Sequence, residues 1–220
     1  WEYRDALERA VDHCPYFSHG YRPMSVAYLK SGDFINWEKL MDKAVHLEPM
    51  EHLGYRGWCR NQFFRDYEGA IADIERLDSL TRYEIGYSAS GAYHLHIAQG
   101  LCYKAIGQSA KAIKVMENQL SVAEYTAGSF DHLHLGVLYF DNDRLDDALE
   151  QFEIQINNND LADCRYYYAM TLKAMGKAYQ NSLIIAKELY LADRRMFDGY
   201  THQMDKVYLR DIELTIAESN

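Results

Sequence analysis

The chain contains two similar stretches, Ala10-Val11-Asp12-His13-Cys14-Pro15 and Ala44-Val45-His46-Leu47-Glu48-Pro49. In each stretch an Ala-Val pair stands the same number of places before a proline, and the two prolines lie 34 residues apart. Self-similarity at a period of roughly 20–50 residues is typical of repeat proteins, which stack one supersecondary unit many times. The spacing therefore predicts a tandem array of helical hairpins.

The spacing inside this period recurs along the chain. Each copy has small or aromatic residues at fixed places on its first helix. On its second helix it has two inward-facing residues that are four places apart. Five copies align on these positions: Met24-Ser25-x-x-Tyr28 with Trp37-x-x-x-Met41, Tyr55-x-x-Trp58-Cys59 with Ala70 and Ile74, Gly100-x-x-Tyr103 with Ala112-x-x-x-Met116, Gly136-x-x-Tyr139 with Ala148-x-x-x-Phe152, and Ala169-x-x-Leu172 with Asn181-x-x-x-Ile185. This alignment makes the second copy one residue short between its helices. It also puts Asn181 where three other copies have alanine.

The pattern resembles the tetratricopeptide repeat, and the fourth copy is the most specific match. The resemblance covers roughly residues 16–190, and its tyrosine-rich style is similar to that of bacterial members of the family. It implies an all-α, right-handed α-solenoid of helix-turn-helix repeats in a single domain, 1–220. The expected parts are a partial repeat (second helix) at 1–15, repeats at 16–50, 51–79, 93–124, 129–160 and 162–191, an inserted loop at 80–92, and a capping helix at 199–218.

Composition and charge limit the class of function. No stretch approaches the ~18 apolar residues that a membrane span needs. The formal charge of −10 repels phosphate backbones and argues against nucleic-acid binding. The cysteines lie far apart without a C-x-x-C pair, so we expect buried thiols without disulfide partners. Because the chain opens at Trp1 without an initiator methionine, we expect a segment upstream of it, and localisation stays open between the cytoplasm and export to the periplasm.

The sequence contains no recognisable motif for catalysis, a cofactor or a metal. It has neither a glycine-rich phosphate cradle nor a nucleophile motif, so we expect neither an enzyme nor a cofactor. Two His-x-His pairs, His94/His96 and His132/His134, are spaced two residues apart. On a helix such residues point about 200° away from each other, whereas ligands of one ion share a face. We therefore expect neither pair to bind one ion, and we predict packing roles for His96 and His132.

The resemblance implies a protein or peptide ligand, bound in the concave groove on the side of each first helix that does not pack against the second. In the aligned register the groove candidates are Arg22, Lys30, Arg56, Arg60, Phe63, Phe64, His94, Lys104, Phe130, Phe140, Tyr166 and Lys173. Basic candidates in an acidic chain favour an acidic ligand, since arginine chelates carboxylates in bidentate fashion. The family's carboxylate clamp for chaperone tails is not matched, because Val26 and Gly57 stand where it has asparagine.

Three alternatives stay open at this point. Arg56 and Arg60 would instead form salt bridges with acidic neighbours such as Glu68 or Asp73. The loop at 80–92 would either contact a ligand or pack its own aromatic residues on the surface. The array would serve as a structural scaffold, forming a homo-oligomer through the ends of the solenoid.

Overall fold

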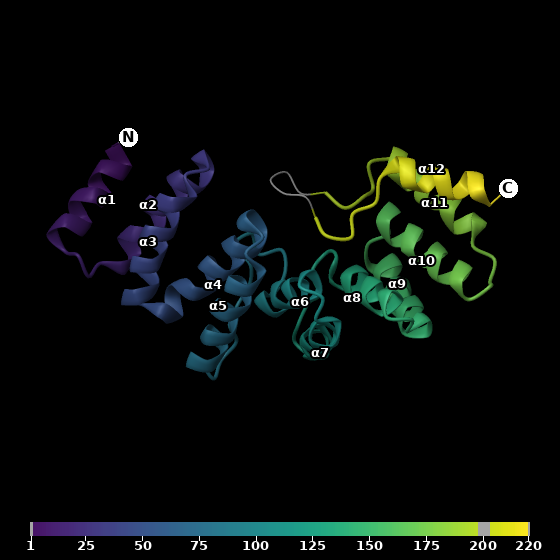
Figure 1. Ribbon diagram of the computed structural model, residues 1–220, viewed down its shortest axis with the longest axis horizontal. Helices are drawn as coiled ribbons and strands as arrows, with labels where there is room; N and C mark the ends of the chain where they lie inside the picture. Colours follow the sequence, from purple (N-terminus) through teal and green to yellow (C-terminus); the bar gives the residue numbers. More distant parts are fainter. Residues whose placement is uncertain (1, 198–202, 220) are drawn as a thin grey trace. The chain divides into compact units, whose positions relative to one another are not determined.

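The computed structural model describes the backbone of residues 2–197 and 203–219, with side chains from residue 5 onward in these ranges. The described residues are mainly α-helical, as the sequence predicts (Figure 1). In chain order the elements are α1 (Glu2–His13), α2 (Ser18–Ser31), α3 (Phe34–Leu47), α4 (Pro49–Cys59), the π-helical turn η1 (Arg60–Phe64), α5 (Tyr67–Leu80), α6 (Leu95–Ala105), α7 (Ser109–Leu120), α8 (Asp131–Asp141), α9 (Leu145–Asn158), α10 (Ala162–Ala174), α11 (Gln180–Leu191) and α12 (Leu209–Glu218).

The chain divides into two compact units, Trp1–Ala89 and Ser90–Asn220, whereas the sequence predicts one domain over 1–220. The first unit contains α1 and the hairpins α2–α3 and α4–α5, the latter interrupted by η1. The second unit contains the hairpins α6–α7, α8–α9 and α10–α11, followed by α12. Within each hairpin the two helices pack against each other. The boundary falls inside the loop predicted at 80–92, and the structure has no helix from Thr81 to His94.

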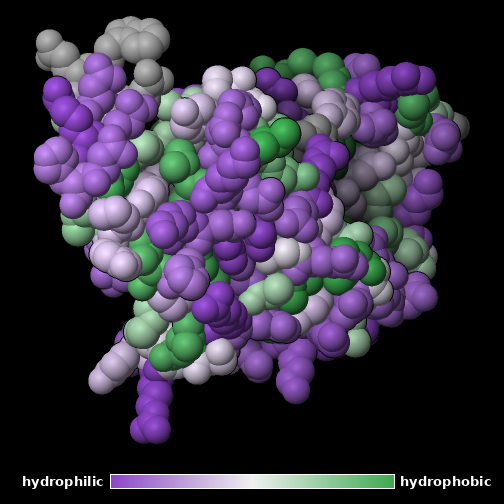
Figure 2. Space-filling model, turned by 60° about the vertical axis from the view of Figure 1, so that its left-hand side comes forward, coloured by the Kyte–Doolittle hydropathy of each residue, from purple (hydrophilic) through white to green (hydrophobic). Residues whose placement is uncertain are grey.

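The face of the molecule drawn in Figure 2 is largely polar. Hydrophilic side chains cover most of the face drawn in Figure 2, and hydrophobic ones are scattered among them. Across the described ranges, no helix is both long enough and apolar enough to cross a bilayer. In the loop between α5 and α6, both Tyr83 and Tyr87 are exposed.

Three of the four cysteines, Cys59, Cys102 and Cys164, are buried as predicted, whereas Cys14 is exposed. Within the described ranges none of them forms a disulfide bond. Burial raises the pKa of Cys59 to about 12. This thiol therefore stays protonated at neutral pH and packs as a small apolar side chain.

The two helices of a hairpin approach most closely at one residue of the first helix. An added Cβ at Gly100 of α6 would lie 2.6 Å from Cγ of Met116 in α7. At Gly136 of α8 it would lie 2.5 Å from Cε1 of Phe152 in α9. Because protein interiors are close-packed, neither position accepts a side chain unless its neighbour moves. Both hairpins have the register that the sequence predicts.

The hairpin of α4 and α5 differs from the predicted register by two residues. The close approach occurs at Gly57, where an added Cβ would lie 3.2 Å from Cβ of Asp73 and 3.2 Å from Cγ1 of Ile74. The aligned pattern places Cys59 at this position. Every residue of the first helix in this copy therefore faces a different direction from the one that the sequence predicts.

The turn η1 accounts for the difference between the predicted and the observed register of this hairpin. Ala112 follows Gly100 after 12 residues, but Ala70 follows Gly57 after 13, so this copy is one residue longer between its helices, not one shorter. A π-helical turn contains one residue more than an α-helical turn. The turn at Arg60–Phe64 absorbs the extra residue before α5 begins.

In the hairpin of α10 and α11 the inward residues are shifted by one place. The sequence predicts Asn181 and Ile185 in these positions, but Asn181 is exposed. Ser182 and Ala186 are buried instead. Small residues thus occupy these two inward positions of α11, beside the buried Leu183 and Leu189, and Asn181 lies outside the packing.

The terminal helices have different environments. Val11 of α1 packs in one cluster with Tyr21 and Met24 of α2. At the other end, α12 begins at Leu209, whereas the sequence predicts a capping helix over 199–218. Of that span, 199–202 lie outside the described residues and 203–208 are not helical. Ile212 of α12 packs in a cluster with Ala186 of α11.

We expect Gly136→Ala to lower the free energy of unfolding by about 1–3 kcal/mol, because the new methyl group would overlap the ring of Phe152. Urea denaturation measures this change. Phe152→Leu removes the atoms that the methyl group meets, so the double variant should lose less than the two single changes summed. Alanine is otherwise preferred over glycine in a helix, so unchanged or higher stability of Gly136→Ala would contradict the close approach.

Candidate functional site

Residues 203–208, here called the C-terminal segment, lie against the first helices of the second unit (Figure 1). We call this surface of α6, α8 and α10 the A face of the second unit. The segment is fixed at two points. Asp205 binds side chains of α6 and α8, and Val207 binds a side chain of α10. The chain therefore covers part of the face on which the sequence predicts a ligand.

The first fixed point is an ion pair formed by Asp205. Its carboxylate accepts hydrogen bonds from Nζ of Lys104 at 2.6 Å and from Nδ1 of His134 at 2.7 Å. Burial alone would raise the pKa of Asp205, but the hydrogen bond and charge of His134 and the charge of Lys104 outweigh it, and the pKa lies below its usual value. The carboxylate is thus ionised at neutral pH. Lys104 is a predicted groove residue, and its Nζ also lies 3.5 Å from Oδ2 of Asp141.

The second fixed point is Asp163 of α10, which is fully buried. Its two carboxylate oxygens accept the backbone N–H groups of Met196 and Val207, each at 2.7 Å. Burial raises the pKa of Asp163, although the two hydrogen bonds oppose this shift. Asp163 therefore stabilises the chain on both sides of residues 198–202.

A cavity of about 230 Å³ lies beside the C-terminal segment. Its wall combines apolar residues of α6 and of the non-helical stretches next to it with polar groups, two of which belong to α8. The lining residues are Ser90, Ala92, Tyr93, Ile97, Leu101, Ser129, Phe130, Asp131, His134, Phe197 and Gln203. Phe130, a predicted groove residue, is among them. The wall is suited to an apolar side chain with a polar group next to it.

The other candidates in the second unit have different surroundings. His94 is buried and accepts the N–H of His96 at the start of α6, and burial lowers its pKa to about 4. Phe140 and Tyr166 are half-buried, and each contacts the ring of Tyr167. Lys173 is exposed, and its ammonium group lies 5.6 Å from the ring centre of Tyr179.

The remaining residues of the two His-x-His pairs bond to second helices. Nδ1 of His96 lies 3.0 Å from Oε1 of Gln119 in α7, and Nδ1 of His132 lies 2.8 Å from Oε1 of Gln151 in α9. Both histidines therefore take part in packing between the helices of a hairpin, the role that the sequence predicts for them.

In the first unit, Arg56 and Arg60 lie between helices and not on an open groove. Arg56 forms a bidentate pair with Asp73 of α5, with Nε 2.8 Å from Oδ2, and Arg60 Nη1 lies 2.9 Å from the same oxygen. Their side chains are only 11% and 16% exposed. This arrangement follows from Gly57 being the residue of close approach, because residues 56 and 60 then face the second helix. The salt bridges involve Asp73, one of the two neighbours expected from the sequence.

The other candidates of the first unit have different neighbours. Arg22 of α2 lies over the ring of Tyr55 in α4, 4.3 Å from its centre, and Lys30 is exposed. Phe63 contacts Trp58, with ring centres 5.3 Å apart. Tyr55 and Trp58, to which the sequence gives packing positions, are half-buried and pack against the core cluster of the first unit.

Phe64 packs among residues of α3. Its ring centre is 4.5 Å from those of Phe34 and Trp37. These rings line a shallow cavity of about 220 Å³ whose polar wall is formed by Glu38, Arg60 and Asp66. Phe63 and Phe64 are both half-buried and pack against the same core cluster, with different ring neighbours.

Stacked two-helix repeats in each unit make the chain an all-α helical-repeat solenoid. No protein-family model matches the sequence, and no curated protein matches it. Several solved structures are similar to the chain. PilW, a widely conserved type IV pilus biogenesis factor, superposes with a TM-score of 0.66 at 16% identity, covering 96% of this chain and 90% of PilW.

Two further structures carry the name of the repeat. YrrB, a tetratricopeptide-repeat protein with an unusual peptide-binding site, superposes with a TM-score of 0.67 at 15% identity, over 84% of this chain and 93% of YrrB. A tetratricopeptide-repeat protein from Parabacteroides merdae gives 0.68 at 15% identity, over 98% and 79% of the two chains. The chain therefore has the tetratricopeptide-repeat fold that the sequence predicts.

The position of Arg56 and Arg60 leads to a prediction for Asp73. We expect Asp73→Ala to lower the free energy of unfolding by about 3–5 kcal/mol, because it leaves two nearly buried guanidinium groups without their shared carboxylate. Asp42→Ala is the matched control, since Asp42 also pairs with Arg56 but is 54% exposed, and it should cost less than about 1 kcal/mol. Urea denaturation measures both. Equal losses would contradict an internal role for this cluster.

Proposed function

We propose that the chain is a protein-interaction module that binds an acidic segment of another protein on the A face of the second unit. The single observation that carries this proposal is the binding of Asp205 by Lys104 and His134. There the face holds a carboxylate from a non-helical piece of chain, whose backbone turns at Asp205. A partner carboxylate would bind the same two groups in place of Asp205.

The cavity beside this ion pair supports the same function. Ile97, Leu101 and Phe130 offer apolar surface close to His134. An apolar side chain next to the partner's acidic residue would fill the cavity, and burial of apolar area would add to the affinity. YrrB, described as having a peptide-binding site, shares the fold and supports a binding role without naming a ligand for this chain.

The C-terminal segment would act as an internal competitor of such a partner. A ligand that needs an open face binds more weakly, in proportion to the fraction of molecules whose face is open. Asp205→Asn weakens the ion pair that fixes the segment and should therefore raise the affinity for an acidic peptide.

A library of acidic and neutral peptides, presented to the whole chain, tests the proposal. We expect acidic peptides with an adjacent apolar residue to be enriched, and Lys104→Gln to weaken their binding at least about tenfold, equivalent to about 1.4 kcal/mol. Lys114→Gln, an exposed lysine on the second helix α7, is the matched control and should bind like the wild type. Equal enrichment of neutral peptides, or full binding by Lys104→Gln, would contradict an acidic ligand on this face.

Self-association is the second candidate function, favoured by exposed apolar residues of the first unit. Tyr16 is 80% exposed and Ile35 is 70% exposed. Sedimentation velocity over a range of protein concentrations separates the two functions. A size that grows with concentration, and that Ile35→Lys reduces, would support a scaffold; a constant size would leave peptide binding as the function.

A further inference from the structure

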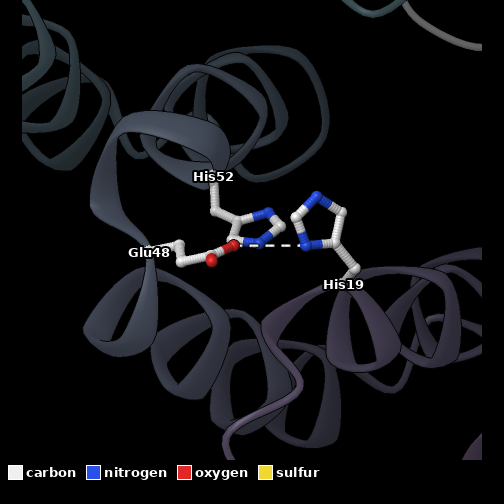
Figure 3. Close-up of side chains that lie close together, drawn as sticks. All are labelled: His19, Glu48 and His52. Atoms are coloured by element: carbon white, nitrogen blue, oxygen red, sulfur yellow. Dashed lines mark ion pairs between the residues drawn. The ribbon is translucent and has the colours of Figure 1, made fainter.

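Three side chains with metal-binding atoms lie together in the first unit (Figure 3). His19 is on α2, Glu48 stands between α3 and α4, and His52 is on α4. One ligand atom from each residue lies within 4.8 Å of the others, and Nδ1 of His19 is 3.2 Å from Oε2 of Glu48. In Figure 3 the carboxylate of Glu48 and the two imidazole rings lie around one small space.

The surroundings of His52 provide a second, independent observation. Its side chain is buried, with 2% of the residue exposed, and neither ring nitrogen finds a hydrogen-bond partner among the described residues. Buried polar side chains in proteins almost always have a partner. The ring nitrogens of His52 are therefore open to a ligand on the side of His19 and Glu48.

The distances are suited to a small transition-metal ion. Bonds of roughly 2.0–2.2 Å from zinc to nitrogen and oxygen place two ligands of a tetrahedral site about 3.3 Å apart. The contact between His19 and Glu48 already has this length. Their side chains are 59% and 48% exposed, so they are able to rotate towards the buried ring of His52.

Ser18 supports the orientation of the cluster. It is buried, its hydroxyl group donates a hydrogen bond to Oε2 of Glu48, and the same oxygen of Ser18 lies 3.1 Å from Nδ1 of His19. Hydrogen bonds from neighbouring side chains commonly fix the orientation of metal ligands. Ser18, which is on the same helix as His19, thus contacts both exposed ligands.

We propose that His19, Glu48 and His52 bind a divalent transition-metal ion, with zinc as the best fit. Two imidazoles and one carboxylate are a ligand set that zinc uses in proteins, with a fourth position for water or another donor. Imidazole ligands favour zinc, copper and nickel over calcium and magnesium, which take oxygen ligands. Because the ligands come from α2 and α4, the ion would join two neighbouring hairpins of the first unit.

Titration of the whole, tag-free chain with Zn²⁺ by calorimetry tests this site. We expect one ion per chain, and at least roughly tenfold weaker binding in His19→Ala and in Glu48→Gln, which change exposed residues and spare the core. The matched controls are His46→Ala and Glu51→Gln, an exposed histidine and an exposed glutamate close to the cluster, which should bind zinc like the wild type.

A third variant addresses the buried ligand. His52→Phe replaces a buried ring whose nitrogens have no hydrogen-bond partner by an apolar ring, so circular dichroism should show an unchanged fold. Because phenylalanine has no ligand atom, calorimetry should show loss of zinc binding. The proposal is overturned if the wild type binds no zinc. It is equally overturned if His19→Ala, Glu48→Gln and a folded His52→Phe keep wild-type affinity, because the ion would then bind other histidines.

Discussion

The architecture of both units depends on how closely two helices approach each other at one small residue. At Gly57, Gly100 and Gly136 the second helix fills the space that a side chain would occupy. This contact fixes the rotation of the first helix about its axis. It thereby decides which residues pack inside the hairpin and which face outward. In the hairpin of α4 and α5 the contact residue lies two places from the predicted one, and Arg56 and Arg60 therefore lie in an interhelical cluster and not on the predicted groove.

The outward surface of the first helices is not simply an open groove. In the second unit the C-terminal segment binds to it through Asp205 and Val207. A buried carboxylate is stable there because Lys104 and His134 compensate the loss of solvation, and the backbone N–H of Val207 is satisfied by Asp163. A partner of this face must therefore offer better interactions than the chain offers to itself. That requirement favours a ligand that combines a carboxylate with apolar area, and it makes binding selective.

The sequence predicts the fold and part of the candidate site. The copies around Gly100 and Gly136 could be aligned because glycine, tyrosine and alanine stand at regular distances. The copy around Gly57 could not, since a one-residue insertion absorbed by a π-helical turn leaves no trace in composition. The ion pair between Lys104 and Asp205 joins residues 101 places apart, and the cluster of His19, Glu48 and His52 joins different helices. Such contacts depend on the folded arrangement and not on local spacing.

The chain's own C-terminal segment covers part of the A face of the second unit. Hydrogen exchange of the backbone N–H groups of Met196 and Val207, followed residue by residue by NMR, measures this contact, because both groups donate to the buried carboxylate of Asp163. Backbone amides that donate to a buried acceptor open rarely. We expect both to exchange far more slowly than amides of an unstructured chain. Exchange of both at unstructured rates, in a protein whose α10 remains protected, would show that the segment does not lie on this face.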